Sequence, residues 1–167
     1  GTHICVELLN QGHQIVVIDN LSNSNFVSLD KVATITEKKI AIARKGQKAS
    51  VLKTTDIIFY NADIRDRNSL QLIFNNQNIA AVIHLAGLKD VGESVKKPLE
   101  YYNNNVIGSV ILFEEMVKAK VETLIFSSSA TVYGNPESLP IEENFQTNEA
   151  INPYGKSKLF IENILKD

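Results

Sequence analysis

The sequence predicts an α/β fold with a doubly wound parallel sheet. Four short apolar segments recur along the chain, and each is followed by small or polar residues, as in strands that helices cover on both faces. Segments with helical periodicity lie between them, and strands that alternate with helices form the βαβ units of such a sheet. The predicted strands are Gln14–Asp19, Asp56–Tyr60, Ala80–Ala86 and Glu122–Ser128.

The helices are predicted from apolar spacing and from end signals. Thr2–Gln11 stops before Gly12, a residue type that commonly closes a helix in the left-handed conformation. Arg65–Asn76 and Pro98–Lys120 place apolar residues three or four positions apart. The last helix begins near Pro153, because proline is favoured in the first turn.

Composition limits the classes of partner. The chain has 167 residues with 17 Lys+Arg and 19 Asp+Glu, and a net charge of −2 argues against nucleic acid or an anionic membrane. No apolar run approaches the ~18–20 residues of a membrane span. Cys5 is the only cysteine, which excludes an internal disulfide and is typical of the cytoplasm. Cys5, His13 and His84 lack matching partners, so no metal site is predicted.

Two polar segments separate the predicted elements. Ile35–Lys53 is locally basic, and we expect a solvated helix end and loop, with a partner-binding patch as the alternative. Pro136–Asn152 is turn-rich, and a loop of this length in a compact domain is often functional.

An acid ends the first predicted strand. In dinucleotide-binding folds, an acid at this place accepts hydrogen bonds from the adenosine ribose and repels a 2′-phosphate, so Asp19 favours NAD over NADP. A glycine-rich loop should precede that acid by about twenty residues, which suits Gly1 as its last glycine. The alternatives are that Asp19 starts a turn and that Gly1 is a trivial terminal residue. Asp63, after the second strand, could accept from an adenine amino group with Ile64 against the ring, or could cap the next helix.

A tyrosine and a lysine lie four residues apart at the start of the last helix. Tyr154 and Lys158 therefore share one helix face. A free phenol has a pKa of about 10, and a neighbouring ammonium lowers it by favouring phenolate. Ser129 and Thr131 follow the last strand, where ligands of open α/β sheets bind, so they could reach a substrate hydroxyl beside Tyr154. Taken singly, the pair also arises by chance and serines are ordinary loop residues.

Two further polar residues lie near predicted strand ends or helices. Asn105 lies in an asparagine-rich run of low helix propensity, which indicates a polar task for at least one of these residues. Gly108 would let this helix approach its neighbour closely. Lys89 follows a strand end and could reach a cofactor or phosphate, or could be a surface lysine.

Together these segments resemble the extended short-chain dehydrogenase/reductase superfamily, above all in VIHLAGLKDVGESVKKPLEYYNNNVIGS and IFSSSATVYG. The resemblance implies a Rossmann-like NAD-binding domain with Tyr154 as catalytic base, Lys158 as its activator, and Ser129, assisted by Thr131, as second hydroxyl partner. Lys89, Ser129 and Tyr154 are the implied substrate contacts. The implied NAD contacts are Asp19, Asn20, Leu21, Ser22, Asn23, Ser24, Asp63, Ile64, Leu85, Ala86, Gly87, Leu88, Lys89, Asn105, Ser129, Tyr154 and Lys158.

Within that superfamily the resemblance is to the nucleotide-sugar 4-epimerases of galactose metabolism. It implies transient oxidation at C4 of a UDP-sugar, interconverting UDP-glucose and UDP-galactose, by a cytoplasmic homodimer. The alternatives are another NAD-dependent nucleotide-sugar epimerase, a 4,6-dehydratase, a simple reductase and a non-catalytic nucleotide-sugar-binding protein. Dehydratases of this superfamily typically carry an Asp-Glu pair where this chain has Ala130 and Thr131, which favours epimerisation. Leu85, Asp90 and Ser109 are mild departures from the family pattern.

The resemblance also implies that residues 1–167 are an incomplete NAD-binding domain. The family has a first strand and two loop glycines before the position of Gly1, and its UDP-binding domain lies beyond Asp167. Without that central strand, Gln14–Asp19 and Ala80–Ala86 would lose the neighbour between them and leave two open edges. We expect residues 1–167 in isolation to bind NAD poorly and to be inactive.

Overall fold

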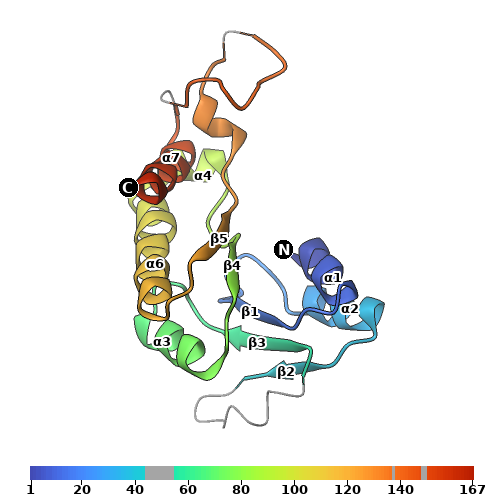
Figure 1. Cartoon of the computed structure of the whole chain (residues 1–167). Coiled ribbons are helices and arrows are strands. Elements are labelled where there is room, and N and C mark those ends of the chain that lie inside the picture. The colour runs from blue at the N-terminus through green and yellow to red at the C-terminus, as the bar shows by residue number, and fades with distance from the viewer. Residues whose placement is uncertain (44–54, 137, 148–149) are drawn as a thin grey trace. The chain divides into compact units, whose positions relative to one another are not determined.

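The computed structural model describes residues 1–43, 55–136, 138–147 and 150–167 (Figure 1). The chain divides into two compact units, Gly1–Asn78 and Ile79–Asp167. Each unit holds a parallel sheet with helices packed on it, which confirms the predicted α/β class. Within the described residues the strand orders are β1-β3-β2 and β4-β5, so the two strands expected to have open edges lie in separate sheets.

In the first unit, the middle strand of the sheet is covered on both faces. Side chains of β3 alternate between the faces, as strand geometry requires. Ile57 and Phe59 join a core with α1 and α2, whereas Ile58 and Tyr60 pack with Ile73 of α3 on the other face. The elements are α1 (Thr2–Asn10), β1 (Ile15–Asp19), α2 (Val27–Thr36), β2 (Ile40–Ile42), β3 (Ile57–Asn61) and α3 (Arg67–Asn76).

The end of α1 and the start of α3 test two sequence predictions. Gly12 has φ 84° and follows the end of α1, where its N–H donates to the Leu9 carbonyl and that of His13 to the Leu8 carbonyl, so the predicted helix stop is confirmed. The N-cap of α3 is Asp66, which accepts from backbone N–H groups inside the first turn. The alternative interpretation of Asp63 as that cap is therefore wrong.

The basic stretch is only partly a loop. Helix α2 ends at Thr36, but Ile40–Ile42 forms the parallel edge strand β2 beside β3. The expectation of a solvated loop was wrong for these three residues because their apolar side chains extend the sheet, where Ala41 packs against the core on the α3 face. Residues 44–53 of the stretch lie outside the described part of the chain.

In the second unit, helices pack beside a two-stranded sheet. Figure 1 shows α6 running alongside β4 and β5. The predicted helix Pro98–Lys120 is continuous in position but changes character, because a π-helical segment, η2, separates α5 from α6. The elements are β4 (Ala81–His84), α4 (Val91–Lys96), α5 (Pro98–Tyr101), η2 (Tyr102–Ile107), α6 (Gly108–Lys118), β5 (Thr123–Phe126), the 3₁₀-helix η3 (Ala130–Tyr133) and α7 (Pro153–Lys166).

The remaining second-unit predictions concern one helix and one loop. Helix α7 begins at Pro153 as predicted, and Asn152 caps it by accepting from the Gly155 N–H. In the described part of Pro136–Asn152 there is no helix or strand, which agrees with the predicted loop. Among the residues that the structure describes, no helix has the length and apolar character needed to cross a membrane.

Replacing the N-cap of α3 should destabilise the first unit. Asp66→Ala removes the acceptor for two backbone N–H groups, and we expect a loss of about 1 kcal/mol in the free energy of unfolding. Asp66→Asn keeps an acceptor and should lose less. Chemical denaturation of both variants and of the unchanged protein, at its natural length, measures the free energies of unfolding. If Asp66→Ala were as stable as the unchanged protein, the capping role would be contradicted.

Candidate functional site

At the carboxyl end of β1, one carboxylate organises the following turn. Oδ1 of Asp19 accepts from the Leu21 N–H at 2.7 Å and from the Ser24 hydroxyl at 2.8 Å. Leu21 has φ 56°, a conformation that leucine rarely adopts and that this hydrogen bond holds. In the described part of the chain Oδ2 of Asp19 accepts no hydrogen bond, so an acceptor remains for a ligand hydroxyl.

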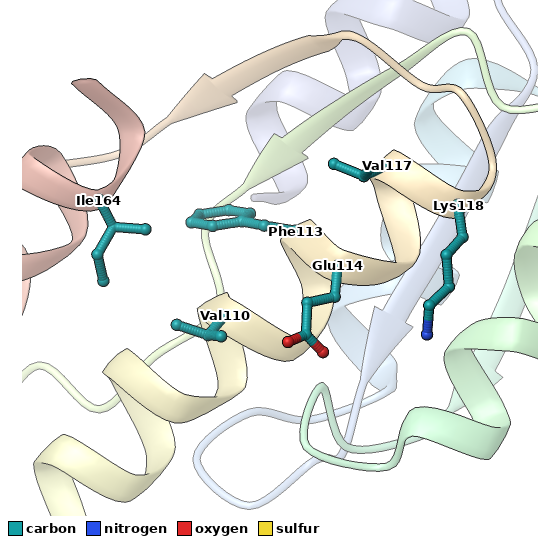
Figure 2. A pocket seen from close by; sticks show the side chains of 6 residues that line it. All are labelled: Val110, Phe113, Glu114, Val117, Lys118 and Ile164. Atoms are coloured by element: carbon teal, nitrogen blue, oxygen red, sulfur yellow. The ribbon is translucent and has the colours of Figure 1, made fainter. Parts of the chain in front are cut away.

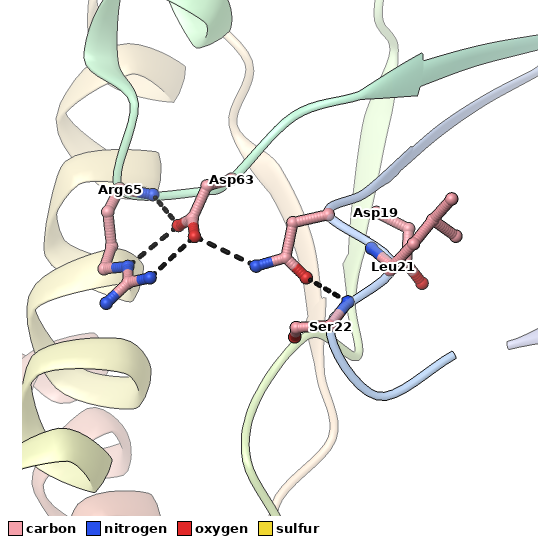
Figure 3. Close-up of polar contacts among 6 residues, drawn as sticks. Asp19, Leu21, Ser22, Asp63 and Arg65 are labelled. Atoms are coloured by element: carbon pink, nitrogen blue, oxygen red, sulfur yellow. Dashed lines mark hydrogen bonds and ion pairs between the residues drawn. The ribbon is translucent and has the colours of Figure 1, made fainter. Parts of the chain in front are cut away.

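A second carboxylate links the ends of β1 and β3 (Figure 3). Oδ2 of Asp63 accepts from the Asn20 amide at 2.9 Å, and Asn20 Oδ1 in turn accepts from the Ser22 N–H at 3.0 Å. The Arg65 guanidinium binds both oxygens of Asp63, at 2.9 and 2.7 Å, and holds the pKa of this carboxyl well below its usual range. Asp63 is therefore a carboxylate at every physiological pH.

The other first-unit residues of the implied NAD set differ in exposure. Ser22, Asn23 and Ser24 are exposed in the turn that follows β1. Ile64 is buried, with 9% of its surface exposed, and offers a ligand little apolar area. The polar groups that remain, led by Asp19, suit the hydroxyls of a ribose.

In the second unit, the turn after β4 is tied to the π-helical segment. Asn105 accepts from the Leu88 N–H at 2.8 Å and donates to the Leu88 carbonyl at 2.9 Å and to the Ser157 hydroxyl at 3.0 Å. Gly87 has φ 156°, and a Cβ there would lie 3.1 Å from Asn105 Oδ1, so the close approach requires glycine. Asn105 has the polar task that its sequence context predicted, as a bridge between the turn and α7.

The rest of that turn is open. Leu85, Ala86 and Lys89 are exposed, and Lys89 has no carboxylate partner among the described residues. Its ammonium is therefore available to a phosphate or ribose. Asp90 begins α4 as an N-cap, accepting from the Glu93 N–H at 2.7 Å, which explains an acid at a position where the family usually has a small residue.

A buried histidine is linked to Asn105 through the hydroxyl of Ser109. His84 Nε2 lies 2.8 Å from the Ser109 hydroxyl, which donates to the Asn105 carbonyl and therefore accepts from the histidine. Burial, aided by the charge of Lys158, lowers the pKa of His84 to about 4, so the ring is neutral at pH 7. His84 therefore has a specific role in this series of hydrogen bonds.

The strand end after β5 brings two hydroxyls together. Ser129 and Thr131 hydroxyl oxygens lie 2.8 Å apart, and the Ser129 hydroxyl also accepts from the Thr131 N–H. A Cβ on Gly155 would lie 2.9 Å from the Thr131 carbonyl oxygen, so glycine is needed for α7 to pack this closely on η3. Tyr154, the residue before that glycine, is half-buried at the start of α7.

Lys158 is a buried ammonium on the face of α7 that carries Tyr154. Its Nζ donates to the Ser127 carbonyl at 2.8 Å and lies 4.7 Å from the centroid of the Phe126 ring. Only 5% of its surface is exposed, and desolvation lowers its pKa to about 8. An ammonium in this setting stabilises an adjacent phenolate more strongly than one in water would.

Sequence reasoning missed several residues of these two sites. Arg65 fixes Asp63, Ser157 receives Asn105, and Glu162 accepts a hydrogen bond from Ser128. Glu162 could have been noticed, since it continues the four-residue spacing of Tyr154 and Lys158. No group of three metal-binding side chains occurs within the described ranges.

Comparison with known proteins places these features in a family. The model of the NAD dependent epimerase/dehydratase family matches residues 1–167. The chain is 50% identical over 167 residues to UDP-glucose 4-epimerases of Yersinia enterocolitica and Bacillus subtilis, covering all of this chain and 45% and 44% of those proteins. It thus spans less than half the length of these curated relatives.

Solved structures agree with the sequence comparison. UDP-glucose 4-epimerase from Bifidobacterium longum, in complex with NAD+ and UDP, matches with a TM-score of 0.88 and 45% identity, covering 99% of this chain and 44% of that one. The enzyme from Stenotrophomonas maltophila, with bound NAD and formylated UDP-arabinopyranose, matches with a TM-score of 0.86 and 41% identity, covering 100% and 44%. The chain belongs to the NAD dependent epimerase/dehydratase family.

Proposed function

We propose that the protein containing this chain is an NAD-dependent UDP-glucose 4-epimerase that interconverts UDP-glucose and UDP-galactose. The observation that carries the proposal is the second-unit site, where α7 holds Tyr154 and buried Lys158 on one face. The hydroxyls of Ser129 and Thr131 pair at the start of η3, which packs against α7 at Gly155. The relatives at 50% identity are named as epimerases of this kind. We further propose that residues 1–167 form only part of its NAD-binding domain.

The first unit contributes the adenosine end of the NAD site in this proposal. Asp19 Oδ2 and the exposed residues 22–24 would bind ribose hydroxyls, and the charge of Asp19 would reject a 2′-phosphate. Asp63, already bound by Asn20 and Arg65, would offer any remaining lone pair to the adenine amino group. In the second unit, Lys89 and Lys158 would contact the nicotinamide end, and Asn105 would shape the turn there.

The side chains of the second unit would handle the sugar proton. NAD, when bound, supplies the hydride acceptor and donor for sugar C4. Tyr154 as phenolate would take the proton of the 4-hydroxyl while C4 loses hydride. After the bound keto sugar has rotated to present its other face, Tyr154 would return the proton to the oxygen as hydride returns to C4. Lys158 stabilises the phenolate electrostatically, and Ser129 with Thr131 would hydrogen-bond the reacting oxygen.

A 4,6-dehydratase is the competing activity within the family. Such a reaction needs an acid and a base beside the sugar to remove a C5 proton and expel the 6-hydroxyl. The hydroxyl pair at Ser129 and Thr131 can hydrogen-bond a reacting oxygen, whereas Ala130 between them offers no titratable group. Epimerisation is the better fit to this segment.

An apolar surface on α6 and α7 is the contact surface that we propose for a second copy of the chain. An open hollow there is lined by Val110, Phe113, Glu114, Val117, Lys118 and Ile164 (Figure 2). Val117 is 76% exposed and, together with the other apolar side chains of the hollow, offers a contact surface to a partner. We propose a homodimer that works in the cytoplasm.

Removing the Tyr154 hydroxyl should abolish turnover without unfolding the protein. We expect Tyr154→Phe, at the protein's natural length, to lower kcat for UDP-galactose by about 100-fold or more, since it deletes the base. Tyr102→Phe, on η2, removes a hydroxyl outside the site and should keep normal activity. Coupled assay of UDP-glucose formation measures both; undiminished activity in Tyr154→Phe would refute the assignment of the base.

Neutralising Asp19 should weaken NAD binding and relax the preference against NADP. Asp19→Asn loses a charged acceptor, and a hydrogen bond to a charged group contributes about 1.5–3 kcal/mol, so we expect NAD affinity to fall about tenfold or more. Asp30→Asn, on an exposed part of α2, is the matched control. Calorimetric titration with each cofactor gives the ratio, and an unchanged ratio in Asp19→Asn contradicts the ribose role.

A charge on the apolar surface should separate the copies. Val117→Asp places a carboxylate in the proposed interface, and we expect light scattering after gel filtration to report half the wild-type mass. Val27→Asp, at another exposed valine on α2, should leave the mass unchanged. A wild-type protein that is monomeric at micromolar concentration would contradict the dimer.

A further inference from the structure

Glu162 has no role in the function proposed so far, yet it lies on the reactive face of α7. Tyr154, Lys158 and Glu162 are spaced by four residues, so they occupy three successive turns of one helix face. Two of these three residues hold the segment that leaves β5. Lys158 Nζ donates to the Ser127 carbonyl, and the Ser128 hydroxyl donates to Glu162 Oε1.

The two contacts involve a single peptide group. The carbonyl that receives Lys158 belongs to the peptide bond between Ser127 and Ser128. The Ser127 N–H is already fixed, because it donates to the His84 carbonyl of β4 at 3.1 Å. The direction of the carbonyl then depends on rotation of the next peptide plane. Anchoring the Ser128 side chain on α7 restricts that rotation.

Lys158 depends strongly on this carbonyl. The ammonium is buried, and the Ser127 oxygen is its hydrogen-bond acceptor in the described part of the chain. A buried ammonium without its acceptor is strongly destabilised, so a turned carbonyl would make the side chain move or lose its proton. Either change would weaken the electrostatic support of a phenolate at Tyr154.

We propose that Glu162 is a positioning residue that, through Ser128, fixes the Ser127–Ser128 peptide so that its carbonyl holds the Lys158 ammonium in register with Tyr154. The inference rests on the function proposed above, because it assigns Glu162 to the activation of that same base. In this role Glu162 does not need to contact the substrate.

The elements packed against α7 carry other titratable groups. His84 of β4 is neutral at pH 7. On α4 and α5, Glu93 is paired with Lys97 and accepts from the Tyr101 hydroxyl. Tyr102 of η2 contacts the Phe160 ring, and Tyr133 belongs to η3. Glu162 is thus the acidic group of α7 that contacts the segment after β5.

The test compares variants of Glu162 and Ser128 in the protein at its natural length. Glu162→Ala and Ser128→Ala each delete the contact, whereas Glu162→Gln keeps an oxygen acceptor without the charge. Asn163→Ala changes the exposed neighbouring residue of the same helix turn and is the matched control. If Glu162→Ala does not fold, as judged by far-UV circular dichroism, Ser128→Ala carries the test.

The decisive readout is the pH profile of kcat for UDP-galactose. Because the phenolate is the reactive form, weaker electrostatic support from Lys158 disfavours it and moves the ascending limb of the profile to higher pH. We expect a displacement of about one unit in Glu162→Ala and Ser128→Ala, with kcat about tenfold lower below the limb, since one unit is a factor of ten. Glu162→Gln and Asn163→Ala should keep the wild-type limb.

Two results would overturn the proposal. One is an unmoved limb with kcat lowered equally at all pH values, and the other is an equal displacement in Glu162→Gln. Failure of the proposed function is recognised separately, because the wild-type protein would then not turn over UDP-galactose. In that case, absorbance titration of the Tyr154 phenol, taken as the difference from Tyr154→Phe, tests the same displacement without activity.

Discussion

The buried ammonium of Lys158 is the contact on which the second unit's site depends. A charged group in a desolvated place needs a fixed acceptor, and here the acceptor is a backbone carbonyl beside the Phe126 ring. The contact forms only if α7 lies tightly against the segment after β5. Gly155 permits that approach, Asn152 sets the start of the helix, and the Asn105 amide holds it through Ser157.

In the first unit, too, hydrogen bonds within the chain fix the charged groups of the site. The carboxyl ends of parallel strands gather polar residues at one edge of a sheet, where ligands of this fold class bind. There, Oδ1 of Asp19 accepts the hydrogen bonds that fix the following turn, and Oδ2 remains as an acceptor. Asp63 is held by Arg65 and Asn20 instead, so the two carboxylates have different work despite their similar positions.

The sequence was sufficient to predict features that depend on apolar periodicity and on helix-end residues. The positions of the four predicted strands and the start of α7 at Pro153 were foreseeable from pattern and spacing. The strand Ile40–Ile42 was not, because three residues in a basic stretch carry too weak an alternation. The π-helical turn at Asn105 and the contact between Ser128 and Glu162 depend on tertiary packing. The pairing of Arg65 with Asp63 is local, but it depends on the backbone conformation after β3, which the residue pattern does not determine.

The site of the second unit depends on Lys158 being held as a desolvated ammonium. The most direct measurement is an NMR titration of the lysine side chains in the protein at its natural length, without added substrate, with Lys158→Arg to assign the signal. We predict a titration midpoint of about 8 for Lys158. A midpoint near the ordinary lysine value of about 10.4 would contradict the account.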